Sequence, residues 1–229
     1  MYEEIKESIA GVCFKMWQKG FVAANDGNVS VRVGEGLYLV TPSGMSKGDV
    51  RAGDIGLVDG ALNVLERPYE GWRPSSELKL HVRCYEERTD IGAVVHAHPP
   101  IATGFAAAHI PLDDCSVIET VLSLGTVPLA PYATPSTDEV PQSAGPLIRR
   151  HDGLLLANHG AVTVGADLRT AYFRMETLEH QAHISLAARL LGGAKSIDAE
   201  NIRRLTELRK SYGIKSADLM ETDGAAGEM

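Results

Sequence analysis

The chain has 229 residues, of which 44% are hydrophobic and 23% are charged. This composition is typical of a soluble globular protein, and the length is sufficient for one compact α/β domain. The formal net charge of -8 and the lack of a dense Lys/Arg cluster argue against a nucleic-acid partner. An anionic substrate is still allowed, because backbone N–H groups and hydroxyls can bind phosphate in an acidic protein.

Cysteine usage and the apolar runs favour a cytoplasmic protein. Cys13, Cys84 and Cys115 are odd in number and widely separated, which argues against a disulfide framework. The acidic start at residues 1–4 predicts no signal peptide. No apolar run approaches the roughly 20 residues that cross a bilayer, so no membrane association is expected.

In the first part of the chain, apolar spacing predicts a helix followed by two hairpins. Apolar side chains recur at helical spacing over residues 3–19, and Gly20 is placed to end that helix. Alternating apolar residues and the turn Asp59–Gly60 indicate antiparallel strands. The strands are expected at residues 29–33, 37–40, 55–58 and 62–65, with a loop rich in hydroxyls and glycine at residues 41–49.

The rest of the chain mixes apolar strands with helices. A helix is expected to open at residues 74–77, and a strand is expected at residues 93–98. The later elements are a short helix at 101–108, an extended edge or loop at 127–135, a helix at 138–150, a strand at 153–162, and helices at 168–191 and 198–210. Residues 1–216 are predicted to form a single domain, because no repeat or linker divides them. Residues 217–229 are expected to be a disordered tail.

Two histidines stand at the end of the strand in residues 93–100, Ala-Val-Val-His-Ala-His-Pro-Pro. Side chains alternate along a strand, so His96 and His98 point to the same face. They can bind a metal together if other elements supply further ligands. A His-x-His pair also occurs by chance, so the pair alone is a weak indication of a metal site.

Three further histidines need separate interpretation. His159 lies in Asn158-His159-Gly160 at the exit of a buried apolar strand, an unusual place for a structural histidine, and this favours a ligand role. His180 and His183 lie three residues apart on a helix. They are interpreted as a surface or packing pair, because nothing nearby completes a ligand set.

The segment Pro74-Ser75-Ser76-Glu77 allows two interpretations. It could supply only helix-capping hydroxyls and a carboxylate that complements the helix dipole. It could instead form an anion-binding helix start with a carboxylate beside it. Three imidazoles and one carboxylate are a suitable ligand set for Zn²⁺ or another late first-row divalent ion. The loops at residues 25–28 and 41–49 could add an anion pocket, although each alone is consistent with an ordinary turn.

Together these motifs resemble the class II aldolase/adducin family over roughly residues 1–215. The resemblance depends on six segments that occur in the family's order with similar spacing: Gly27-Asn28-Val29-Ser30-Val31-Arg32, Thr41-Pro42-Ser43-Gly44, Pro74-Ser75-Ser76-Glu77, His96-Ala97-His98, Pro131-Tyr132-Ala133-Thr134 and Asn158-His159-Gly160. Each segment is weak by itself, and jointly they are specific. The resemblance implies an α/β fold of three layers, α/β/α, around a central, mostly antiparallel sheet. It also implies a four-fold symmetric homotetramer with active sites at subunit interfaces.

The resemblance further implies a divalent-metal-dependent aldolase. Its substrate would be a ketose 1-phosphate of the L-fuculose 1-phosphate or 5-deoxyribulose 1-phosphate type, cleaved to dihydroxyacetone phosphate and a short aldehyde. Zn²⁺, with Mn²⁺ or Co²⁺ as alternatives, would bind His96, His98 and His159. Glu77 would coordinate the metal at rest and then act as the base. The positions that match the phosphate-binding residues are Asn28, Ser43, Gly44, Ser75 and Ser76.

In one region the chain departs from the family's aldolase pattern. That pattern has a tyrosine, donated across the interface, which helps to protonate the aldehyde oxygen, whereas residues 112–129 contain no tyrosine. Glu119 is the most evident ionisable group there, and it is either a helix-surface acid or an acid/base group. Tyr212 matches a C-terminal tyrosine that closes over the family's active site.

Other activities on the same scaffold remain alternatives. They are a methylthioribulose-1-phosphate dehydratase, a decarboxylase and a pentulose-5-phosphate epimerase. Glu77 favours the aldolase over the epimerase, because the epimerase pattern has aspartate at the equivalent place. A non-catalytic scaffold protein is disfavoured, because the scaffold members lack the histidines that this chain retains.

Overall fold

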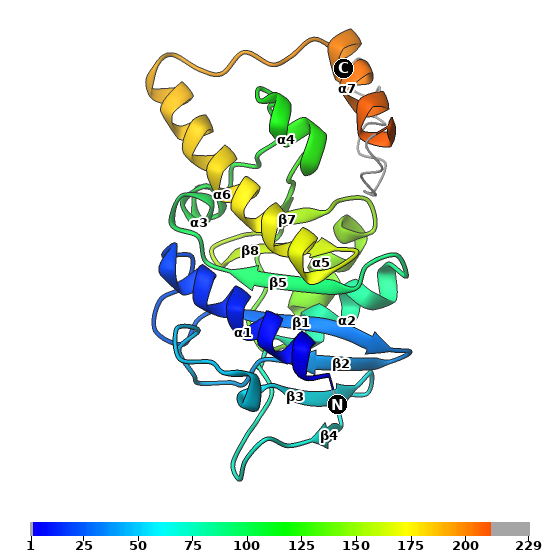
Figure 1. Ribbon diagram of the computed structural model, residues 1–229. Helices are drawn as coiled ribbons and strands as arrows, with labels where there is room; N and C mark the ends of the chain where they lie inside the picture. Colours follow the sequence, from blue (N-terminus) through cyan, green and yellow to red (C-terminus); the bar gives the residue numbers. More distant parts are fainter. Residues whose placement is uncertain (1, 212–229) are drawn as a thin grey trace.

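The computed structural model describes residues 2–211, and its central feature is a β-sheet. Within these residues the sheet has eight strands in the order β4-β3-β2-β1-β5-β8-β7-β6 (Figure 1). Every neighbouring pair is antiparallel except β6 with β7, which confirms the predicted mostly antiparallel sheet. The strands are β1 (Asn28–Gly34), β2 (Leu37–Val40), β3 (Gly56–Asp59), β4 (Val64–Glu66), β5 (Ala93–Ala97), β6 (Leu129–Ala130), β7 (Gly153–Leu156) and β8 (Gly160–Gly165).

Helices cover both faces of the sheet, as the three-layer α/β/α prediction requires (Figure 1). One face is covered by α1 (Glu3–Gln18), α3 (Pro100–Ala107) and α6 (Leu168–Leu190), and the other by α2 (Leu78–Glu87) and α5 (Glu139–Ile148). Each face has its own hydrophobic core, and the adjacent residues Val94 and Val95 enter opposite cores. The remaining elements are the short 3-10 helix η1 (Ala52–Asp54), α4 (Ile118–Ser123) and α7 (Ala199–Ser211).

The strand that carries the histidine pair lies in the middle of the sheet. All residues of β5 are buried, because helices cover both of its faces and β1 and β8 pair with its two edges. A strand buried on both faces has a nearly continuous apolar sequence, which explains the run Ala93–Val95. His96 therefore projects from a rigid, water-excluded position.

The structure corrects two of the predicted elements. The strand predicted at residues 153–162 is a hairpin, in which β7 and β8 flank a tight turn at residues 157–159. The apolar character continues through both strands because both are buried, so hydrophobicity did not reveal the turn. The helix predicted to open at Pro74 begins at Leu78, with Glu77 as its N-cap residue. Pro74 forms a β-bridge with Pro42 instead, so the two serines precede the helix.

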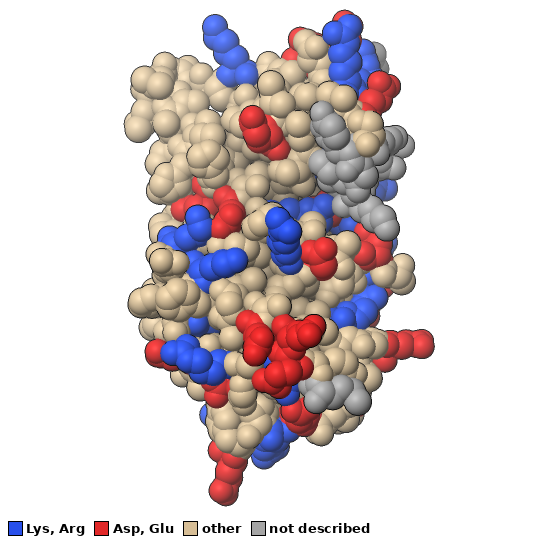
Figure 2. Space-filling view, in the orientation of Figure 1, with Lys and Arg blue, Asp and Glu red and all other residues tan. Residues whose placement is uncertain are grey.

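Among the helices of residues 2–211, none combines the length and the hydropathy of a membrane-spanning segment. Basic and acidic side chains are interspersed over most of the face shown in Figure 2. Tyr212 and the predicted tail at residues 217–229 lie outside the described residues.

Candidate active site

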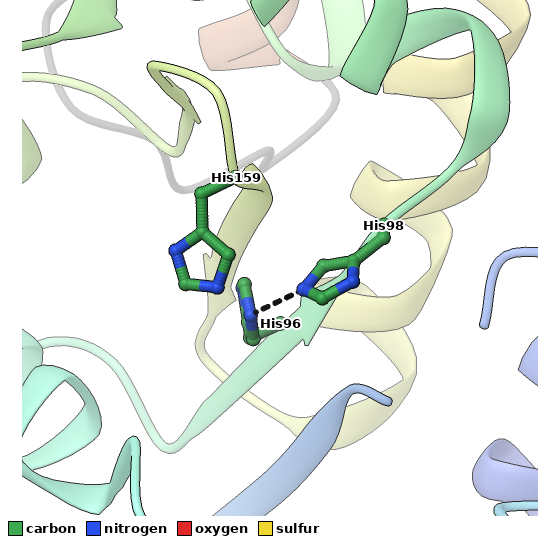
Figure 3. Close-up of side chains that lie close together, drawn as sticks. All are labelled: His96, His98 and His159. Carbon is green, nitrogen blue, oxygen red and sulfur yellow. Dashed lines mark hydrogen bonds between the residues drawn. The ribbon is translucent and has the colours of Figure 1, made fainter. Parts of the chain in front are cut away.

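Three histidines from two neighbouring strands meet at one end of the sheet. His96 lies near the end of β5, and His98 follows that strand directly. Because β5 and β8 pair with Ala97 opposite Ala161, the β7–β8 turn that carries His159 lies beside the end of β5. One ligand atom from each of the three imidazoles lies within 4.8 Å of the others (Figure 3). The predicted convergence of His96, His98 and His159 is thus present in the structure.

Two special backbone positions make this approach possible. Asn158 has φ of 58°, a left-handed conformation that asparagine tolerates better than most residues, and it turns the chain immediately before His159. Gly160 follows, and a Cβ atom there would lie 2.5 Å from the Ala97 carbonyl oxygen and 2.6 Å from His98 Cδ2. Only glycine fits so close to the neighbouring strand. The geometry of the turn therefore accounts for Asn158 and Gly160, which stand on either side of the histidine.

Hydrogen bonds to the ring nitrogens direct the imidazoles toward a common centre. His96 Nδ1 donates to the Ala161 carbonyl oxygen over 2.9 Å, so the neutral ring carries its lone pair on Nε2. That lone pair faces His98 Nε2 at 3.2 Å, while the Asp26 carboxylate lies 3.2 Å from His98 Nδ1. A carboxylate or carbonyl on the far nitrogen is the usual partner of a metal-binding histidine. The separation of the two Nε2 atoms is close to the roughly 3.3 Å between two nitrogens bound tetrahedrally to Zn²⁺.

Burial keeps two of the rings neutral. Desolvation lowers the pKa of His96 well below its ordinary value, and the neighbouring His159 and His98 lower it further. Desolvation also lowers the pKa of His159. Divalent metals bind the neutral imidazole, so a site that disfavours protonation is ready for a cation without first releasing a proton. The donor set and its electrostatics fit a divalent metal ion.

The histidines form one wall of a cavity of about 200 Å³. Asn28 lies opposite His96 in the β1–β5 ladder, which places its side chain beside the cluster. All nine residues that the sequence predicted for metal and phosphate binding line this cavity: Asn28, Ser43, Gly44, Ser75, Ser76, Glu77, His96, His98 and His159.

The hydroxyl-rich part of the cavity is assembled from two loops that lie side by side. The Pro42–Pro74 bridge joins them, and the Ser43 N–H donates to the Arg73 carbonyl oxygen over 2.9 Å. The buried Lys47 ammonium donates to the carbonyl oxygens of Asn25 and Met45, over 3.1 and 2.8 Å. The bridge and these backbone hydrogen bonds thus fix the two loops of the cradle against each other.

Glu77 lies in the cavity but outside the tight histidine group. Its Oε1 accepts hydrogen bonds from the Ser136 N–H over 2.7 Å and from the Ser136 hydroxyl over 3.3 Å. Among the described residues, Oε2 has no hydrogen-bond partner and remains available to a proton or a cation. The carboxylate, which is mostly buried, is therefore held in one orientation by a single residue.

Sequence reasoning missed two residues that support this site. Asp26 belongs to the turn noted at residues 25–28, but no local pattern indicates its contact with His98. Ser136 comes shortly after the Pro131–Thr134 motif and adopts a left-handed φ of 65°, which the sequence did not suggest. Both contacts join residues far apart in the chain.

Comparison with known proteins shows the family to which the chain belongs. Residues 7–186 match the family model described as Class II Aldolase and Adducin N-terminal domain. The chain belongs to this family. It is 32% identical over 188 residues to the 5-methylthioribulose-1-phosphate/5-deoxyribulose-1-phosphate aldolase of Rhodospirillum rubrum, covering 82% of each chain. The family supports a lyase enzyme.

Two further similar proteins carry names of different enzymes. A solved structure named L-fuculose 1-phosphate aldolase aligns with a TM-score of 0.84 and 30% sequence identity, covering 90% of this chain and 96% of that one. The 3-oxo-tetronate 4-phosphate decarboxylase of Escherichia coli is 29% identical over 187 residues, covering 80% of this chain and 86% of that one. The fold is therefore that of a class II aldolase, and more than one reaction is named among similar proteins.

Of the two remaining predicted residues, the structure describes only Glu119. Glu119 lies in the first turn of α4, where its side chain is exposed. It is not among the residues that line the cavity. Tyr212 lies outside the described residues.

Proposed function

We propose that this class II aldolase family member is a divalent-metal-dependent enzyme that cleaves a ketose 1-phosphate to dihydroxyacetone phosphate and a short aldehyde. The observation that carries the proposal is the cavity in which three histidines, a fixed carboxylate and a hydroxyl-rich cradle meet. The names of two similar proteins support a substrate of the 5-deoxyribulose 1-phosphate or L-fuculose 1-phosphate type.

The proposed metal ligands are His96, His98 and His159, with Glu77 as a further ligand at rest. Zn²⁺ is the proposed ion, because it prefers imidazole nitrogens in a four-ligand site, and Mn²⁺ and Co²⁺ are the alternatives. When bound, the ion would supply Lewis-acid stabilisation of the negative charge that develops as the C3–C4 bond breaks.

The cradle would hold the substrate phosphate at a fixed distance from the histidines. Hydroxyls and backbone N–H groups can bind a phosphate without a dedicated basic side chain. This anchoring orients the reacting carbon atoms and so lowers the entropic part of the barrier. The residues proposed to contact the phosphate are Asn28, Ser43, Gly44, Ser75 and Ser76.

Glu77 is the proposed base. In cleavage, its Oε2 takes the proton of the C4 hydroxyl, the C4–O bond becomes the aldehyde carbonyl, and the C3–C4 bonding electrons pass to C3. Proton return to C3 then gives dihydroxyacetone phosphate. Ser136 supports this role because its two hydrogen bonds to Oε1 fix the carboxylate and leave Oε2 for the substrate.

A panel of 1-phosphorylated ketoses, assayed with Zn²⁺, Mn²⁺ and Co²⁺, tests this reaction. Release of dihydroxyacetone phosphate, followed through a coupled reductase, is the expected result. Glu77→Gln is expected to retain the fold and much of the metal while losing roughly 10²–10⁴-fold in turnover. Glu70→Gln, which changes an exposed glutamate outside the cavity, serves as the matched control.

Other products in these assays would contradict the aldolase proposal and establish another activity on the same scaffold. Loss of water from methylthioribulose 1-phosphate without triose phosphate would establish a dehydratase, and a change of configuration in a pentulose 5-phosphate an epimerase. Release of CO₂ from a 3-oxo acid 4-phosphate would establish a decarboxylase, the alternative that the Escherichia coli relative favours.

The proposal includes a cytoplasmic homotetramer, built from single domains that span residues 1–216, with active sites at subunit interfaces. The free cysteines support a reducing compartment. Exposed apolar side chains support self-association, since Leu190 and Leu191 are 82% and 88% exposed and Ile118 beside Glu119 is 50% exposed. In such an assembly Glu119 would reach the cavity from a neighbouring copy, and Tyr212 is proposed to close over the active site. Light scattering coupled to size exclusion should give a mass four times that of one chain.

A further inference from the structure

A chain of buried hydrogen bonds lies directly behind Asn28 and joins β1 to α2. The Tyr85 hydroxyl lies 2.8 Å from Ser30 Oγ, which lies 2.7 Å from His81 Nδ1. His81 Nε2 in turn lies 2.5 Å from Asn28 Oδ1. Asn28 and Ser30 share one face of β1, and His81 and Tyr85 share one face of α2. All four side chains are at least nine-tenths buried, and only Asn28 lines the cavity.

The direction of each hydrogen bond follows from the chemistry of the groups. Burial lowers the pKa of His81 to about 3, so its ring is neutral and has one donor and one acceptor nitrogen. A carboxamide oxygen only accepts, which places the proton of His81 on Nε2. Nδ1 then accepts from the Ser30 hydroxyl, and Ser30 Oγ accepts from the Tyr85 hydroxyl.

The opposite direction would leave a donor unsatisfied. With the Asn28 amino group turned to His81, Nδ1 would donate to Ser30 and Ser30 would donate to Tyr85. The Tyr85 proton would then need another acceptor, and among the described residues Ser30 is its only hydrogen-bond partner. A buried donor without a partner costs more than a hydrogen bond contributes, so the direction from Tyr85 to Asn28 is favoured.

We propose that Tyr85, Ser30 and His81 are positioning residues that orient the Asn28 carboxamide so that its amino group, and not its oxygen, faces the cavity. The fixed amide then donates to an anionic group and repels none of its oxygens. This inference rests on the proposed phosphate cradle and deepens it. Asn28 is selective for an anion because a distant tyrosine hydroxyl fixes the polarity of the whole chain of hydrogen bonds.

Titration of the zinc-loaded full chain with inorganic phosphate, followed by calorimetry, tests the proposal. His81→Leu is expected to raise the phosphate Kd by about tenfold, because the amide is free to present either end. His81→Gln keeps an N–H donor near Asn28 Oδ1 and should recover most of the affinity. Cys84→Ala truncates another buried residue of α2 outside this chain of hydrogen bonds, so it is the control for loss of stability alone.

A double-mutant cycle with Asn28→Ala separates positioning from general destabilisation. His81→Leu should have no further effect on the Kd when Asn28 is already alanine. Equal effects of His81→Leu in both backgrounds would overturn the inference, as would a ring ¹⁵N spectrum that places the His81 proton on Nδ1. If the wild-type chain does not bind phosphate, the proposed phosphate cradle fails and this inference fails with it. If the wild type binds phosphate and His81→Leu binds it equally well, only the inference fails.

Discussion

His81 and His96 are both buried histidines whose pKa is lowered by desolvation, yet their surroundings differ in kind. Both nitrogens of His81 have complementary partners, Ser30 and Asn28, so the neutral ring is fully satisfied by the protein. His96 has one such partner, the Ala161 carbonyl, and its other nitrogen faces a second imidazole.

Burial alone therefore does not identify a ligand histidine. A ring whose two nitrogens both have protein partners holds structure together, whereas a ring whose lone pair points toward other imidazoles can offer that lone pair to a shared cation. In this chain the two kinds of histidine lie close together. Asn28 contacts His81 and lies opposite His96 in the β1–β5 ladder.

Removing a ligand from the histidine cluster should have the largest effect. His159→Ala is expected to lower bound zinc below stoichiometric levels and activity by more than about a thousandfold, because Lewis-acid catalysis contributes several kcal/mol. His180→Ala changes an exposed histidine of α6 outside the cluster and should leave both unchanged. Elemental analysis and the aldolase assay measure the two effects. Full metal content in His159→Ala would remove that residue from the ligand set.

Glu119 lies outside both the histidine cluster and the surroundings of His81. Its substitution tests whether a group from outside the described cavity completes the site. Glu119→Gln is expected to lower kcat by about a hundredfold, the low end for general acid–base catalysis, without changing bound metal. Asp113→Asn changes an exposed acid just before α4 and is the control. A change of less than twofold would make Glu119 a helix-surface acid.

The satisfied histidine should be visible in the pH dependence of stability. The folded pKa of His81 is about 3 and its ordinary value is 6.5, so between these values the unfolded chain binds the extra proton. Stability from this group is thus present above pH 6.5 and falls with pH below it, by about 2 kcal/mol at pH 5. Urea unfolding of the chelator-treated protein at pH 7 and 5 should show a smaller loss in His81→Gln. Equal losses would place the acid sensitivity elsewhere.

Asp26 offers the mildest perturbation of the histidine cluster. Asp26→Asn keeps the size of the side chain but removes the charge opposite His98 Nδ1, and metal affinity is expected to fall by about tenfold. Asp49→Asn, on a neighbouring loop outside the cavity, is the control. Competition with a chromophoric chelator measures both affinities. Unchanged affinity in Asp26→Asn would show that His98 is oriented by its backbone alone.

Much of the fold was accessible from local patterns. Strand β2 was predicted with its observed ends, and the helix predicted at residues 3–19 ends one residue earlier in the structure. The β7–β8 turn was missed because both strands are buried and their apolar sequence continues across it. Likewise, α2 begins at Leu78 because Pro74 forms a β-bridge with Pro42. The residues near Pro74 in the sequence do not indicate this contact.

By itself, the sequence determined which residues could carry the chemistry. Strand alternation requires His96 and His98 to share a face, and the family motifs contain the residues that line the cavity. Only the tertiary structure decided how those residues are held: Asp26 on His98, Ser136 on Glu77, and His81 behind Asn28. The physical reason is that side-chain periodicity depends on neighbours a few residues away. The orientation of a carboxylate, an imidazole or an amide depends instead on partners that strand register and loop closure bring from distant parts of the chain.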